Sequence, residues 1–175
     1  MSLLRPFALL LLLALGACLY VPPQDPPGPS YYVMRHLHTP QGATDPDLTQ
    51  EGQRLARTLP AFFELDRPAA IYVSSTKRAQ QTAAPLAQAI GIAPKIYDPA
   101  DTPGLVARVK AEHGNVLIVG HSNTVPDIVE QLGGTRPEPI AHDQFADIWH
   151  ISGYHRETMK FRLGEDRSSA RTGLH

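Results

Sequence analysis

Three short apolar runs with strand character each lead into cationic residues, and this arrangement constrains the fold more than any other feature. The runs and the cations that follow them are 31–34 with Arg35 and His36, 70–73 with Lys77 and Arg78, and 116–120 with His121. In an open α/β sheet the carboxyl ends of the strands meet at one ligand-binding edge. Guanidinium forks pair with phosphate oxygens, and a helix N-terminus adds its dipole. The sequence therefore predicts a phosphate-handling site at that edge.

Apolar segments with strand character alternate with segments of helical periodicity along the chain. The expected strands are 31–35, 70–74, 93–97, 116–119, 145–150 and 159–163. The expected helices are 49–65, interrupted at Pro60, then 77–90, 103–113 and 126–132. Thr49 is a plausible N-cap and Gly91 a C-cap. This alternation predicts an α/β three-layer sandwich, with a mostly parallel central sheet covered by helices on both faces and the last two strands at its edge.

The bulk composition limits the domain count and the class of partner. The chain has 175 residues, of which 42% are hydrophobic, and a formal net charge of −1. This length provides one domain with a real core and is too short for two. The near-neutral charge and the lack of a long Lys/Arg run argue against nucleic acid as the main partner.

The N-terminal segment resembles an export signal. Arg5 precedes an apolar run over 6–17, which is shorter than the roughly 20 residues that a spanning helix needs. The run ends at Ala17-Cys18, which resembles the lipobox of bacterial lipoproteins, where the cysteine is diacylated. Ordinary cleavage near Ala17 and an uncleaved anchor are the alternatives. Cys18 is the only cysteine, so a disulfide scaffold and a cysteine-based zinc site are excluded.

These features predict four segments and a location. Residues 1–17 form a lipoprotein-type signal peptide, 18–29 a proline-rich tether, 30–165 the folded domain and 166–175 a flexible tail. Five prolines within 22–30 make the tether semi-rigid. We expect an exported protein of a bacterial cell envelope that faces the periplasm and is held at the membrane through its N-terminal lipid anchor.

Four sequence blocks resemble those of the histidine phosphatase superfamily, the group of proteins that includes the phosphoglycerate mutases. Three of them carry the predicted site: Val33-Met34-Arg35-His36, then residues 74–83 with the sequence SSTKRAQQTA, then Val119-Gly120-His121-Ser122-Asn123. A fourth, Leu48-Thr49-Gln50-Glu51-Gly52, lies between the first two. The blocks occur in the order found in the family, and the resemblance covers roughly 31–163.

The resemblance implies a role for each matching residue. His36 is the nucleophile and forms a phosphohistidine intermediate. Arg35 and Arg78 clamp the phosphoryl oxygens and stabilise charge in the transition state, while His121 donates a hydrogen bond to the transferring group. The residues expected to line the same pocket and bind substrate are Ser122 and Asn123. No metal and no cofactor are required, because the arginines neutralise the phosphate.

The implied activity is that of a phosphohydrolase acting on phosphomonoesters or phosphohistidine. Its partner is then a phosphorylated small molecule or a phosphoprotein. The alternative is a non-catalytic phosphate-binding lipoprotein that keeps the cationic pocket. A second alternative is a metal site formed by His36, His38 and His121, against which stands the lack of a nearby carboxylate or cysteine ligand.

The chain departs from the family pattern at two places. Leu37 replaces the usual glycine after the nucleophilic histidine, which places a bulky side chain where the backbone turns around phosphate. The usual general acid is also missing. The candidates are Asp98 and Asp101, with His38 a weaker one, but both aspartates are equally well explained as turn formers. Without an acid, the chemistry favours substrates with easily displaced leaving groups, such as phosphohistidine.

Overall fold

The computed structural model describes residues 28–42, 44–153 and 157–165. The predicted signal peptide, most of the predicted tether and the predicted tail lie outside the described residues. Among the helices in the described part of the chain, none is both long and apolar enough to cross a membrane.

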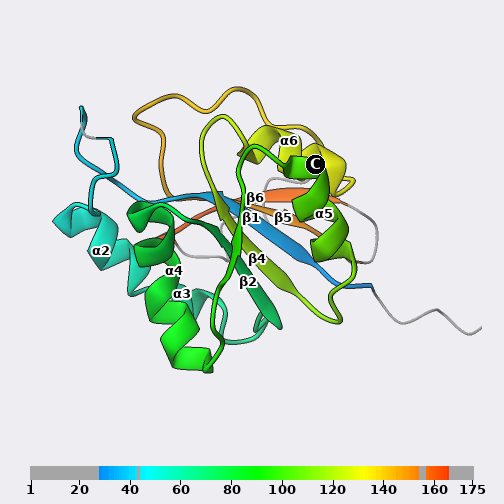
Figure 1. Ribbon diagram of the computed structural model, residues 1–175. Coiled ribbons are helices and arrows are strands. Elements are labelled where there is room, and N and C mark those ends of the chain that lie inside the picture. The colour runs from blue at the N-terminus through cyan, green and yellow to red at the C-terminus, as the bar shows by residue number, and fades with distance from the viewer. Residues whose placement is uncertain (1–27, 43, 154–156, 166–175) are drawn as a thin grey trace, which may run out of the picture.

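A single six-stranded sheet with the order β3-β2-β4-β1-β5-β6 forms the middle layer (Figure 1). Its strands are β1 Tyr31–Arg35, β2 Ala70–Ser74, β3 Lys95–Tyr97, β4 Val116–Gly120, β5 Asp147–Ile151 and β6 Thr158–Arg162. The pairs β1–β4, β2–β4 and β2–β3 are parallel. The pairs β1–β5 and β5–β6 are antiparallel. The prediction of a mostly parallel sheet with its last two strands at one edge is therefore confirmed.

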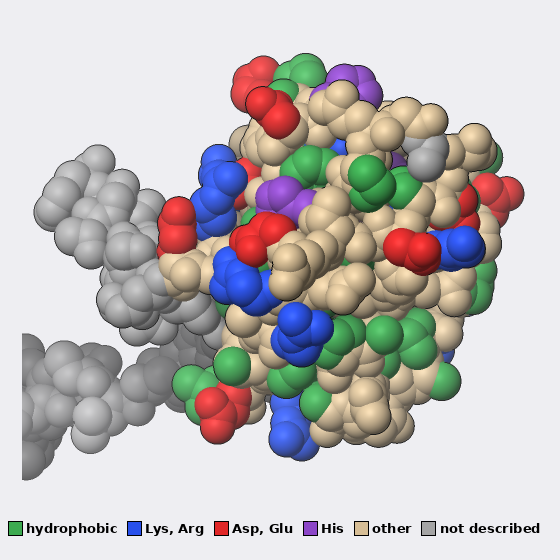
Figure 2. All heavy atoms as spheres, turned by 90° about the vertical axis from the view of Figure 1, so that its left-hand side faces the viewer, with side chains coloured by type: hydrophobic (Ala, Val, Ile, Leu, Met, Phe, Trp, Pro, Cys, Tyr) green, Lys and Arg blue, Asp and Glu red, His purple; other side chains and the backbone are tan. Residues whose placement is uncertain are grey.

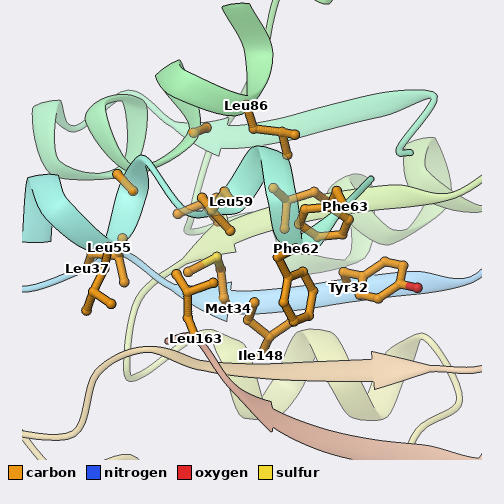
Figure 3. Packing of buried hydrophobic residues seen from close by; sticks show 14 of the residues in the cluster. Tyr32, Met34, Leu37, Leu55, Leu59, Phe62, Phe63, Leu86, Ile148 and Leu163 are labelled. Atoms are coloured by element: carbon orange, nitrogen blue, oxygen red, sulfur yellow. The ribbon is translucent and has the colours of Figure 1, made fainter. Parts of the chain in front are cut away.

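Helices cover both faces of the sheet (Figure 1). They are α2 Gln50–Ala56, α3 Leu59–Phe62, α4 Lys77–Ile90, α5 Thr102–Lys110 and α6 Val125–Gln131. Alternate residues of each strand point to opposite faces, because the side-chain period of a strand is two. Tyr32 and Met34 pack under α2, α3 and α4 (Figure 3). Tyr31 and Val33 pack under α5 and α6. These two apolar layers confirm the three-layer sandwich.

Local sequence signals explain where the helices begin and end. Thr49 is the N-cap of α2, and its hydroxyl accepts a hydrogen bond from the Gly52 N–H. The expected helix over 49–65 is divided into α2 and α3 because Pro60 lies in the first turn of a new helix. Gly91 ends α4 in the left-handed conformation at φ 73°.

The expected strand over 93–97 is shorter than predicted, since β3 starts only at Lys95. Pro94 precedes it and has no N–H to donate to a sheet.

The surface carries both signs of charge. On the face seen in Figure 2, acidic and basic side chains are interspersed and the hydrophobic ones are scattered. This view therefore offers no broad basic surface for a polyanion.

Candidate active site

The three cation-bearing blocks meet in one cavity of about 830 Å³. The cavity walls include all six residues expected in the pocket: Arg35, His36, Arg78, His121, Ser122 and Asn123. Arg35 ends β1 and His121 follows β4, its parallel neighbour, so both residues lie at the carboxyl ends of their strands. Two further loops, around 38–46 and 142–145, complete the walls. The structure thus places the site where the topology of a parallel sheet requires it.

Arg35 is held along one edge of its guanidinium group. Nη1 donates to the carbonyl oxygens of Ala141 at 2.9 Å, His142 at 3.2 Å and Gln144 at 2.8 Å. Its Cζ lies 4.0 Å from the centre of the Phe145 ring. Nε is buried and has no hydrogen-bond partner. An unpaired buried donor is costly in a folded protein. The Nε–H of Arg35 is therefore suited to donate a hydrogen bond to an oxygen of a bound anion.

His36 lies on the floor of the cavity and is only 5% exposed. Its backbone N–H donates to the Gly120 carbonyl at 2.9 Å, which fixes the chain next to β4. The ring Nδ1 is 2.9 Å from the Leu37 carbonyl oxygen. A carbonyl can only accept, so Nδ1 carries the proton and Nε2 keeps its lone pair. Burial, with a smaller contribution from Arg35, lowers the pKa of His36 to about 3, and the ring is neutral near pH 7.

Arg78 belongs to the first turn of α4 and forms an ion pair with Asp45. Its Nη1 lies 3.2 Å from Asp45 Oδ1, and the two side chains are 19% and 39% exposed. The same carboxylate accepts the backbone N–H of Lys77 at 3.1 Å, at the start of the helix. Asp45 therefore holds Arg78 from the loop that precedes α2.

His121 is oriented by a hydroxyl pair that the sequence did not single out. Its Nε2 lies 2.9 Å from the Ser74 Oγ, which lies 3.0 Å from the Thr76 Oγ1. The rings of His36 and His121 have their centres 5.4 Å apart. Burial, then Arg78 and Arg35, lowers the pKa of His121 to about 4. When Ser74 donates to Nε2, the proton of the neutral ring resides on Nδ1, where it can serve as a donor.

Replacing Ser74 by alanine should remove this orientation. We expect kcat on an aryl phosphate to fall by roughly ten- to a hundredfold, since a small displacement of a catalytic group costs up to about 10²-fold. The matched control is Ser75→Ala, because Ser75 is exposed and its side chain makes no hydrogen bond in the described structure. Steady-state kinetics of the two variants provide the measurement. Equal activity of Ser74→Ala and the wild type would contradict the positioning role.

The loop that binds Arg35 is itself anchored to the sheet. The Gln144 amide donates to Asp147 Oδ2 at 2.7 Å, and Asp147 is 3% exposed. Arg162 pairs with the same carboxylate at 3.3 Å. Ala146 adopts φ 70°, a left-handed conformation that is costly for any residue with a Cβ. Backbone strain of this kind persists only where tertiary contacts impose it, and here the Ala146 carbonyl accepts the Leu163 N–H at 2.8 Å.

The two acid candidates do not reach the cavity. Asp98 Oδ1 accepts the Ala100 N–H at 2.9 Å, and Asp101 Oδ1 accepts the Gly104 N–H at 2.9 Å as the N-cap of α5. Neither residue lines the cavity walls. Of the two readings of these aspartates, the turn and cap roles agree with the structure.

Leu37 does not occupy the pocket, whereas His38, the weaker acid candidate, does reach it. Leu37 is fully buried in the apolar layer under α2 and α4, so its bulk leaves the phosphate-binding wall free (Figure 3). Its N–H donates to Thr82 Oγ1 at 3.0 Å. His38 lines the cavity, and its ring centre lies 4.5 Å from that of Phe145. Within the described residues, no group of three His, Cys, Asp or Glu side chains is arranged to hold a metal ion.

Sequence reasoning missed three groups of residues around the site. These are the hydroxyls of Ser74 and Thr76, the carboxylate of Asp45, and the wall formed by 142–145. Ser74 begins the second sequence block, and its place at the end of a buried strand was a usable signal. The wall gave none, because it reaches Arg35 across more than 100 residues of chain.

Residues 32–100 match the family described as the histidine phosphatase superfamily, branch 1. The matched residues include the blocks that carry Arg35, His36 and Arg78, and the rest of the domain completes the fold and supplies His121. This family match, together with the site and the fold, supports a phosphatase of the histidine phosphatase type. Among curated proteins, no significant sequence match is found.

Solved structures of low sequence identity share the fold. The protein histidine phosphatase SixA, in a complex with tungstate, has a TM-score of 0.56 at 19% identity, covering 71% of this chain and 91% of its own. A mycobacterial glucosyl-3-phosphoglycerate phosphatase, in a complex with VO3, has a TM-score of 0.60 at 17% identity, covering 79% of this chain and all of its own. These likenesses show a shared fold and leave the substrate open.

Proposed function

We propose that the protein hydrolyses phosphomonoesters or phosphohistidine through a phosphohistidine intermediate on His36. The observation that carries the proposal is the state of His36: its Nδ1 is bound to the Leu37 carbonyl, which leaves Nε2 unprotonated in a cavity that also contains two arginines. A neutral imidazole nitrogen is a competent nucleophile toward phosphorus. The ring needs no deprotonation before it attacks at neutral pH, because its pKa is lowered to about 3.

The remaining residues of the cavity provide electrostatic stabilisation. The unpaired edge of Arg35 and the guanidinium group of Arg78 offset the charge on the phosphoryl oxygens, which is the main requirement in phosphoryl transfer. His121, held by Ser74, donates to the same group. Water then attacks the phosphohistidine, inorganic phosphate leaves, and His36 is restored. The oxyanions tungstate and VO3 in the two related structures support an oxyanion site in this fold.

Turnover of p-nitrophenyl phosphate by the purified full-length chain tests the proposal. Its leaving group needs little protonation, so turnover depends on His36 and the cationic pocket alone. We expect hydrolysis that vanadate inhibits and that persists after treatment with a strong chelator. Phosphate binding without any turnover would instead support a non-catalytic phosphate-binding protein. Activity lost to the chelator and restored by a divalent ion would support the metal site of His36, His38 and His121.

We also propose that the protein is a lipid-anchored protein of a bacterial envelope. The support is the sequence alone: a short apolar run followed by Cys18 and a proline-rich segment. Two acyl chains give stable anchoring, whereas one gives only marginal binding. The wild type should therefore partition with membranes until detergent is added, and Cys18→Ser should remain unlipidated. A soluble wild type whose N-terminus is not Cys18 would overturn this proposal and leave the phosphatase assignment unaffected.

A further inference from the structure

Asp143 is the only carboxylate among the described residues that line the cavity. It is exposed at the rim, whereas His36 is buried at the floor. Among the described residues Asp143 forms no hydrogen bond and no ion pair. Its charge nevertheless raises the pKa of Arg35, against the larger lowering effect of burial, which shows that the two groups lie near one another. A carboxyl group with no structural partner among the described residues is thus present near Arg35, at the rim of the cavity.

The backbone fixes Asp143 in this position. The carbonyls of its two neighbours, His142 and Gln144, both accept from Arg35 Nη1, at 3.2 and 2.8 Å. Gln144 is further bound to the buried Asp147. Asp143 is therefore carried on a short stretch of chain that is held on both sides, which is a suitable support for a group that must be accurately placed.

Asp45, which lies close to the site, and the two aspartates predicted from the sequence as acids are engaged elsewhere. Asp45 accepts from the Lys77 N–H and pairs with Arg78. Asp98 and Asp101 stabilise a turn and a helix start away from the cavity.

In-line displacement directs the leaving oxygen away from the attacking nitrogen. With His36 at the floor, the leaving oxygen points toward the rim, where Asp143 lies.

We propose that Asp143 is the general acid for the leaving group, and that the natural substrates are phosphomonoesters of ordinary alcohols. This inference rests on the proposed function. In the first step the His36 Nε2–P bond forms, the P–O bond to the alcohol breaks, and the Asp143 carboxyl gives its proton to the departing oxygen. In the second step water attacks phosphorus, the N–P bond breaks, and the carboxylate takes a proton from that water. Atoms and protons balance, and Asp143 returns to its starting state.

The test compares leaving groups of different basicity in wild type, Asp143→Asn and Glu138→Gln. Glu138 is an exposed carboxylate of the same loop that does not line the cavity, so its variant is the matched control. For Asp143→Asn we expect kcat/KM on glycerol 2-phosphate to fall by roughly 10²–10⁴-fold, the usual contribution of a general acid. On p-nitrophenyl phosphate and on a phosphohistidine peptide it should change by less than about threefold, because these leaving groups need little or no protonation. Glu138→Gln should behave as the wild type on all three.

Three results would overturn the inference. One is an equal loss on all substrates, which would show that Asp143 affects the cavity as a whole and does not act on the leaving group. Another is no loss on glycerol 2-phosphate, and the third is a wild type that hydrolyses the aryl ester but not the alkyl one. Failure of the proposed function is recognised separately, because the wild type would then turn over none of these substrates and carry no phosphate on His36.

Discussion

His36→Ala should abolish phosphate transfer, lowering kcat/KM on p-nitrophenyl phosphate by roughly 10⁴-fold or more, as loss of a nucleophile does in other covalent enzymes. The physical reason is that the other histidine beside it, His121, has its Nε2 bound to Ser74 and does not present that nitrogen to the phosphate. Wild type quenched with alkaline detergent during turnover of labelled substrate should retain label that is stable to base and is released on later treatment with acid. His36→Ala should retain none.

The control for this experiment is His38→Ala. His38 lines the same cavity. Unlike the Nδ1 of His36, the Nδ1 of His38 is buried without a hydrogen-bond partner, so no carbonyl fixes its tautomer. We expect this variant to keep the label, with at most a modest change in rate. Label that survives in His36→Ala and disappears in His38→Ala would transfer the nucleophilic role to the second residue of the pair.

The pKa values of the two histidines define the pH range in which this chemistry operates. Both are lowered by burial and by the arginines, to about 3 for His36 and about 4 for His121. Both rings of the free enzyme are therefore neutral throughout the range in which an ordinary histidine titrates. The same shift makes folding less favourable as the pH falls below about 6.5, because the unfolded chain then binds protons that these buried rings exclude.

Local signals in the sequence were sufficient to predict most of the fold. Apolar runs of four or five residues gave β1, β2 and β4, because strands buried on both faces are uniformly apolar. Thr49 and Gly91 marked helix ends through capping chemistry that involves only neighbouring residues. The start of β5 was placed two residues too early. Ala146 resembles a strand residue in sequence, but tertiary contacts hold it in a left-handed conformation.

The site was predictable to the extent that it depends on strand order. Arg35, His36 and His121 follow strands, and a parallel sheet brings such residues to one edge. The carboxylates were not predictable in this way. Asp98 and Asp143 both lie in loops, and they differ in which of the two loops folds over the cavity. The 141–144 loop is held over the cavity by Arg35, which donates to the Ala141 carbonyl although the two residues are 106 positions apart in the sequence.

Arg35→Lys and Arg78→Lys form a pair that separates catalysis from loop anchoring. Lysine keeps the charge but has no planar fork, so each change should lower kcat/KM on p-nitrophenyl phosphate by roughly 10²–10³-fold, the cost of losing an oriented donor in a transition state. Only Arg35 also donates to three carbonyls of the 141–144 loop and stacks on Phe145.

The two variants should therefore differ in stability. Leaving these part-buried carbonyls without their donor costs about 1–3 kcal/mol in total, and each kcal/mol lowers Tm by about 2–4 °C in a domain of this size. A lysine amine replaces part of the lost bonding, so we expect Arg35→Lys to melt roughly 3–6 °C below the wild type. Arg78→Lys should melt within about 1 °C of it, because an ion pair as exposed as that with Asp45 contributes little to stability. Thermal melts and steady-state kinetics of the two variants provide the measurement. Equal melting temperatures with equal losses of activity would mean that Arg35 binds phosphate but does not hold the loop that carries Asp143.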